Sequence, residues 1–203
     1  MARKRDPERP VVLSRIYTRT GDDGSTALGD MSRTRKTDLR LAAYADVEEA
    51  NAAIGVAVAL GELPDDLVAV LAQVQNDLFD AGADLCVPLT ENPETAGQAL
   101  RIDEGYVERL EEACDRYNES LETLRSFVLP GGAPGAALLH VARTVARRAE
   151  RSAWAALEEH GELMSPLPAR YLNRLSDLLF ILARIANAER GEVLWKPGGP
   201  PRS

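Results

Sequence analysis

The chain of 203 residues has few cysteines, no long apolar run and no excess of positive charge. Its two cysteines, Cys86 and Cys114, cannot make a disulfide framework. With no signal peptide recognised, both are expected to be reduced thiols in a cytoplasmic protein. No apolar run approaches the roughly 18 to 20 residues that cross a bilayer, so no membrane partner is expected. A net charge of −8 and a pI near 4.9 argue against a general nucleic-acid binder.

Histidine is equally scarce, and this limits the metal chemistry that the chain can perform. A metal oxidase built on a helical bundle needs paired Glu-x-x-His ligands on facing helices. His140 and His160 are the only histidines, and neither follows a glutamate at that offset. The adjacent carboxylates of Asp22 and Asp23 are expected to be solvated. We therefore predict no metal site made of protein side chains.

Aromatic residues make up only 5% of the chain, whereas alanine is abundant, and this balance favours close-packed helices over a sheet. Apolar residues at three- and four-residue spacing, with Asp38 as a helix N-cap, predict five helices and no strong strand. Their expected ranges are 38–60, 64–85, 102–121, 136–160 and 169–188. The predicted fold is all-α, a five-helix up-and-down bundle preceded by an irregular glycine-rich loop. We expect a basic tail at 1–15, the helical domain at 16–190, and an irregular tail of unassigned role at 191–203.

The fourth predicted helix has an unusual polar face. At 100° per residue, Arg143, Arg147 and Glu150 fall within about 60° of one another, opposite a row of alanines and valines. An exposed face normally mixes glutamate with lysine, whereas this one concentrates guanidinium groups, which suit phosphate and carboxylate. A salt-bridged, solvated face is the alternative interpretation. In an acidic protein, a local cationic cluster indicates a site for a small anion.

A second candidate segment precedes the first helix. Residues 16–26 contain two glycines, three threonines and a serine, which predict neither a helix nor a packed strand. Such a segment can present hydroxyls and backbone N–H groups to an anion, or it can be a flexible loop. The spacing to Lys36 differs from that of a Walker A loop.

Four segments, taken together, resemble one family. They read YTRTGDDG at 17–24, SFVLPGG at 126–132, RTVARRAER at 143–151 and YLNRLSD at 171–177. In this order they closely resemble the ATP:cob(I)alamin adenosyltransferases of the propanediol-utilisation type, over about residues 16–187. The resemblance implies a homotrimer with active sites between subunits, transfer of the 5′-deoxyadenosyl group of ATP to the cobalt of cob(I)alamin, and release of triphosphate.

The resemblance also implies which residues bind the nucleotide. The glycine-rich loop is expected to close over ATP, the fourth helix to supply most of the charged contacts, and the last helix to supply an amide. The expected ATP-binding residues are Thr18, Arg19, Thr20, Gly21, Thr26, Ala27, Lys36, Arg147, Arg148, Ala149, Glu150, Arg151 and Asn173. Lys36 and Arg147, with Mg²⁺ carried by ATP, are expected to stabilise the triphosphate leaving group.

Three residues are assigned to the cobalamin site by the same resemblance. Phe127 is expected to lie against the lower face of the corrin, where it excludes the lower axial ligand and makes reduction to Co(I) easier. Arg143 is expected to pair across the subunit boundary with a carboxylate of the first helix. That carboxylate is Glu48 in this chain, where the family usually has aspartate, so the pair carries one extra methylene. Phe127, Arg143, Glu48 and Arg147 are thus the expected catalytic residues.

The implied partners are ATP, reduced cobalamin, a flavin reductase and an adenosylcobalamin-dependent mutase. The alternative is a non-catalytic helical module that binds nucleotide or cobalamin.

Overall fold

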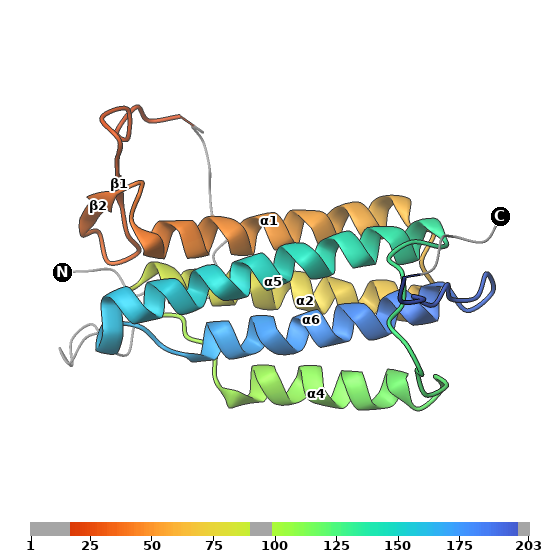
Figure 1. Ribbon diagram of the computed structural model, residues 1–203. Coiled ribbons are helices and arrows are strands. Elements are labelled where there is room, and N and C mark those ends of the chain that lie inside the picture. Colours follow the sequence, from red (N-terminus) through yellow and green to blue (C-terminus); the bar gives the residue numbers. More distant parts are fainter. Residues whose placement is uncertain (1–16, 90–98, 199–203) are drawn as a thin grey trace.

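The computed structural model describes residues 17–89 and 99–198, and in this part of the chain it contains five α-helices and one small hairpin (Figure 1). The helices are α1 (Leu39–Leu60), α2 (Asp65–Cys86), α4 (Glu104–Asn118), α5 (Pro134–His160) and α6 (Leu167–Ala186), with a 3-10 turn η1 (Gly161–Leu163) between the last two. The hairpin consists of β1 (Ser25–Ala27) and β2 (Arg33–Arg35). The predicted helical bundle is confirmed, and the helix ends differ from prediction by a few residues.

α5 lies between α1 and α6 and packs along both, while α4 covers the far side of α6 (Figure 1). α5 can approach its neighbours closely because the side chains on its buried face are small. Ala142, Ala146, Ala149 and Ala156 are completely buried there. Leucines of α6 and α2 fill the remaining core. Among the described helices, none has both the length and the apolar character needed to cross a membrane.

The hairpin is a difference from the prediction, which gave no strand before the first helix. β1 and β2 are antiparallel, with Thr26 opposite Thr34. Both strands have only three residues and neither is buried. The sequence therefore shows no alternation of apolar and polar residues that would predict them. The hairpin continues directly into α1, because Asp38 caps that helix by accepting a hydrogen bond from the backbone N–H of Arg40 at 2.8 Å. The predicted N-cap is therefore confirmed.

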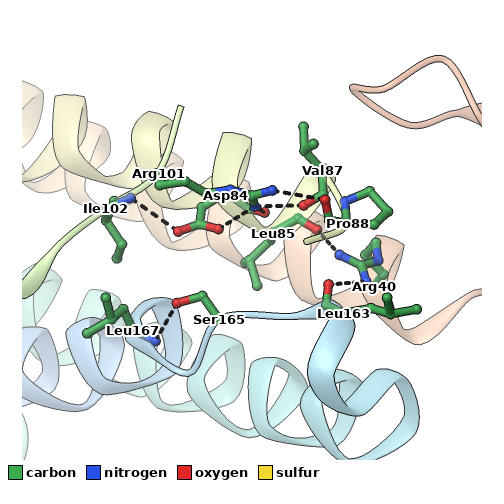
Figure 2. A network of polar contacts seen from close by, with 10 residues as sticks. All are labelled: Arg40, Asp84, Leu85, Val87, Pro88, Arg101, Ile102, Leu163, Ser165 and Leu167. Carbon is green, nitrogen blue, oxygen red and sulfur yellow. Dashed lines mark hydrogen bonds and ion pairs between the residues drawn. The ribbon is translucent and has the colours of Figure 1, made fainter. Parts of the chain in front are cut away.

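A buried polar network fixes the end of the bundle next to the hairpin (Figure 2). Arg40 is 2% exposed and donates hydrogen bonds to the carbonyls of Leu85, at 2.9 Å, and Leu163, at 3.1 Å. Arg101 donates to the carboxylate of the buried Asp84 at 2.7 Å. These bonds join the start of α1 to the end of α2 and to the turn after α5. The hairpin is therefore connected to a part of the bundle that is held by several hydrogen bonds.

Candidate functional site

The arginine-rich face of α5 forms a hollow of about 370 Å³. The residues that line it are Arg143, Thr144, Arg147, Arg148, Glu150 and Arg151. Arg147 and Arg151 are exposed, and neither makes an ion pair or side-chain hydrogen bond with any residue in the described ranges. The sequence-predicted cluster therefore exists as a surface feature, and two of its cations are available to an anionic ligand.

Arg143 differs from its neighbours because part of its side chain is buried. Its guanidinium carbon lies 5.9 Å from the centroid of the Phe180 ring on α6. Its Nε is buried and has no hydrogen-bond partner among the described residues. Burial, and to a lesser extent the charge of Arg147, lowers the pKa of Arg143. A buried donor without a partner is costly, so this group is suited to an acceptor from another molecule.

Arg148 faces α1 as well as the hollow. Its Nε lies 3.7 Å from a carboxylate oxygen of Asp46, and its Nη2 forms an ion pair with Glu49. Both carboxylates belong to α1, so Arg148 joins α1 to α5. Ala149 is fully buried, which leaves its side chain facing the core and not the hollow.

Asn173 of α6 contacts the arginine-rich face of α5. Its Nδ2 donates to a carboxylate oxygen of Glu150 at 3.0 Å, and its Oδ1 accepts from Arg174 at 3.1 Å. The bond to Glu150 brings the polar stripe of α6 to the edge of the arginine hollow. Two predicted ATP residues from different helices are therefore neighbours.

The glycine-rich segment forms a folded turn in front of the hairpin. The hydroxyls of Thr18 and Thr20 lie 2.8 Å apart, and Arg33 donates to the carbonyl of Thr20 at 3.0 Å. A Cβ at Gly21 would lie 2.9 Å from the backbone carbonyl oxygen of Ser25, at the start of β1, and 3.1 Å from the Lys36 ammonium. Glycine therefore allows the turn to lie close to the backbone of β1, with Lys36 against it. Arg19, Thr26 and Ala27 lie in the same unit, so the predicted loop residues are gathered together.

Asp38 ties this unit to the far end of α5. Besides capping α1, its carboxylate accepts a hydrogen bond from Thr34 at 2.7 Å and lies 2.9 Å from Nε2 of His160. Burial alone would raise the pKa of Asp38, but the hydrogen bonds from Thr34, Arg40 and His160 outweigh it and lower that pKa. The hairpin is thus held at the His160 end of α5.

The loop that precedes α5 lies at the end opposite His160 (Figure 1), and this loop contains Phe127. Its side chain is 76% exposed, and its ring centroid is 6.1 Å from that of Trp195. An aromatic side chain held this far out of the core is unusual for a structural anchor and indicates a contact surface.

Comparison with known proteins now decides the family. The family model described as cobalamin adenosyltransferase matches residues 16–186. The chain belongs to the cobalamin adenosyltransferase family. It is 66% identical over 189 residues to the corrinoid adenosyltransferase of Mycobacterium tuberculosis, covering 93% of this chain and 96% of the relative. With the corrinoid adenosyltransferase of Bacillus subtilis it shares 42% identity over 180 residues, which is 87% of this chain and 89% of the relative.

Solved structures agree with this family membership. A phenylalanine-to-histidine variant of the PduO-type ATP:corrinoid adenosyltransferase of Lactobacillus reuteri, complexed with cobalamin and ATP, superposes with a TM-score of 0.81. It is 33% identical and is covered over 97% of its length by 90% of this chain. An arginine-to-lysine variant of the same enzyme, complexed with ATP, gives a TM-score of 0.78 at 34% identity, over 89% of this chain and all of that one.

In this family member, Glu48 and Arg143 form no ion pair within the chain as described. Glu48 is exposed and lines a groove of about 250 Å³ between α1 and α2, beside Tyr44 and Phe79. Phe79 is 73% exposed. The groove and the arginine hollow are therefore separate surfaces of the protomer. The pairing of these two residues across a subunit boundary stays a prediction.

The structure also has contacts around the Phe127 loop that the sequence did not predict. Trp195 lies beside Phe127, although the tail that carries it was given no role. Asn187, 5% exposed, accepts a hydrogen bond from the backbone of Ala133 at 2.9 Å. The only sign of these contacts in the sequence was the presence of a tryptophan, Trp195, in a chain poor in aromatic residues. Among the described residues, no cluster of three or more His, Cys, Asp or Glu side chains could hold a metal ion.

Proposed function

We propose that the protein transfers the 5′-deoxyadenosyl group of ATP to the cobalt of cob(I)alamin and so makes adenosylcobalamin. The cobalt electron pair attacks C5′, the bond between C5′ and the phosphate oxygen breaks, and triphosphate leaves with that bond's electrons. The observation that carries this proposal is the guanidinium-lined hollow on α5 in a member of the adenosyltransferase family. A variant of a relative with the same fold has a solved structure in complex with cobalamin and ATP.

The protein's part in this reaction is electrostatic and geometric, because cobalt supplies the nucleophile. Negative charge grows on the triphosphate as it leaves, so cations placed at that end lower the barrier. Arg147 is exposed and without a partner in the described chain, and Lys36 lies against the glycine turn. We assign both to the triphosphate. Asn173, Glu150 and Arg151 bind the nucleotide beside them, together with the Thr18–Gly21 turn.

We place each active site between two subunits of a homotrimer. α5 has 27 residues, which corresponds to about 40 Å of helix. The hairpin is attached at its His160 end and the Phe127 loop at its other end. One nucleotide cannot reach both ends of the same chain. The arginine hollow lies midway between them, at residues 143–151. We propose that a site takes the hairpin from one subunit and the arginine hollow with its Phe127 loop from the next.

The subunit boundary also supplies the partner that Arg143 lacks. The buried Nε–H of Arg143 would donate to the carboxylate of Glu48 of an adjoining copy, since Glu48 is exposed beside an open groove. The longer glutamate keeps the charge of the family's usual aspartate and reaches one methylene further.

Phe127 forms the lower boundary of the corrin site. Its exposed ring excludes the lower axial ligand, which leaves the cobalt four-coordinate and makes the Co(I) state easier to reach. Mg²⁺ arrives with the phosphates of ATP. In the cytoplasm, a flavin reductase supplies the electrons and an adenosylcobalamin-dependent mutase receives the product.

The experiment mixes the protein anaerobically with ATP and chemically reduced cobalamin and follows the absorbance spectrum. We expect loss of the Co(I) spectrum and growth of a light-sensitive cobalt–carbon product, with one triphosphate released per product. Phe127→Ala should bind ATP normally but lose most activity when a physiological reductant is used. Val128→Ala, one residue along the same loop, is the matched control. Binding of both substrates by the wild type without product would instead support a non-catalytic binding module.

A further inference from the structure

The C-terminal segment after α6 returns across the bundle end and pairs with the loop that carries Phe127. Val128 and Leu194 form an antiparallel bridge. On either side of it, the N–H of Trp195 donates to the carbonyl of Phe127 at 2.7 Å, and the N–H of Leu129 donates to the carbonyl of Val193 at 2.8 Å. We call residues 191–195 the strap and residues 122–133 the Phe127 loop.

The pairing sorts the side chains of this short ribbon onto two faces. Because side chains alternate along paired strands, residues flanking the bridge lie on one face and the bridged residues on the other. The flanking set is Phe127, Leu129, Val193 and Trp195, which are 76%, 46%, 64% and 46% exposed. Four large apolar side chains thus form one exposed surface, and the strap supplies half of it. Such a surface on a soluble bundle indicates a contact with an apolar ligand.

Trp195 is the cross-strand neighbour of Phe127 in this register. Their ring centroids are 6.1 Å apart and the planes are tilted by 59°, a favourable arrangement for an aromatic pair. The hydroxyl of Ser126 also donates to the carbonyl of Trp195 at 2.7 Å. The backbone and the ring of Phe127 are therefore both held by the same strap residue.

The last turn of α6 anchors the strap and the loop together. Arg184, 8% exposed, pairs with Glu192 at 2.7 Å and donates to the carbonyl of Glu122 at 2.8 Å. Asn187 accepts from the backbone of Ala133 and donates to the carbonyl of Gly191 at 2.7 Å. These two side chains hold both ends of the Phe127 loop and the start of the strap.

We infer that Trp195 is a positioning residue for Phe127, and that the strap completes the apolar platform on which the corrin rests. The inference depends on the proposed function, since Phe127 must first act on the corrin. Without the indole ring, the Phe127 ring gains rotational freedom and spends less time under the cobalt. An aromatic pair of this kind shifts such an equilibrium about 3- to 10-fold.

The test measures the coordination of cobalt directly. Cob(II)alamin is bound with ATP, and electron paramagnetic resonance gives the ratio of four- to five-coordinate cobalt. For Trp195→Ala we expect this ratio and kcat to fall about 3- to 10-fold, with the KM for ATP unchanged. Trp195→Phe, which keeps a ring on that face, should recover both values. Leu194→Ala is the matched control, because Leu194 lies on the opposite face of the same strap.

Three results would overturn the inference: wild-type coordination in Trp195→Ala, an equal loss in Leu194→Ala, or additive losses when Trp195→Ala is combined with Phe127→Ala. If Trp195→Ala does not fold, the coordination ratio of Trp195→Leu is compared with that of Trp195→Phe. Both variants keep an apolar side chain, but only the second keeps an aromatic ring. The coordination ratio requires no turnover. An inactive wild type would therefore refute the proposed function, while the coordination ratio would still decide the role of Trp195.

Discussion

Two adjacent arginines of α5 should respond in opposite ways to the same substitution. The resemblance assigns both Arg147 and Arg148 to ATP, but the structure divides them. Arg147 makes no ion pair within the described chain, whereas Arg148 is paired with Asp46 and Glu49 of α1. Glutamine removes the charge and has nearly the helix propensity of arginine. We therefore compare Arg147→Gln with Arg148→Gln, each serving as the control for the other.

The expected magnitudes follow from these surroundings. A hydrogen bond to a charged group contributes about 1.5 to 3 kcal/mol, so Arg147→Gln should weaken ATP binding about 10- to 100-fold. Its thermal midpoint should stay at the wild-type value. Arg148→Gln breaks a partly exposed ion pair between helices, so its midpoint should fall by a few degrees at most, with ATP affinity within about threefold of wild type. Calorimetric titration and thermal denaturation measure the two quantities. Equal losses of ATP affinity in both variants would refute the division of roles.

Three further predictions concern the subunit boundary and the hairpin. If Glu48 of one subunit meets Arg143 of the next, a double-mutant cycle with glutamine at each position should give a coupling above about 1 kcal/mol, the ceiling for an exposed pair; a coupling near zero in both activity and trimer stability would exclude the bridge. Gly21→Ala should raise the KM for ATP, also in a Lys36→Met background, because its Cβ would press on the backbone carbonyl oxygen of Ser25 as well as on Lys36; a wild-type KM in Gly21→Ala would contradict this reasoning. The folded-state pKa of Asp38 lies below its ordinary 3.8, so its stabilisation is complete above that pH and is lost as pH falls further. The difference in thermal midpoint between wild type and Asp38→Asn should therefore vanish in strong acid, and a difference that persists there would disprove the assignment.

The sequence predicted the helices well because their signals are local. Asp38 as an N-cap, three- and four-residue apolar spacing, and the alanine face of α5 all depend on neighbours within a few turns. The same locality explains the arginine hollow, since Arg143, Arg147 and Glu150 share a helix face whatever surrounds them.

The features that were missed depend on distant partners. The hairpin has three-residue strands that no apolar pattern marks. The strap meets its loop through contacts such as that of Ser126 with Trp195, 69 residues apart in the chain. Likewise, nothing on α5 alone predicts that Arg148 faces two carboxylates of α1. Residue identity could suggest such groups, but only tertiary packing decides where they point.

A site shared between two subunits leads to one last prediction, and measurements of activity are sufficient to test it. Each chain carries its hairpin and its Phe127 loop at opposite ends of α5, so it contributes half of each of two neighbouring sites. Lys36→Met damages one half and Phe127→Ala the other. In a ring of three chains assembled at random from equal amounts of both variants, about a quarter of the sites combine two undamaged halves. Co-expressed or co-refolded variants should therefore recover about a quarter of wild-type activity, although each alone has little. A mixture no more active than its separate components would place both residues in the same chain's site, and would contradict the assembly proposed from the length of α5.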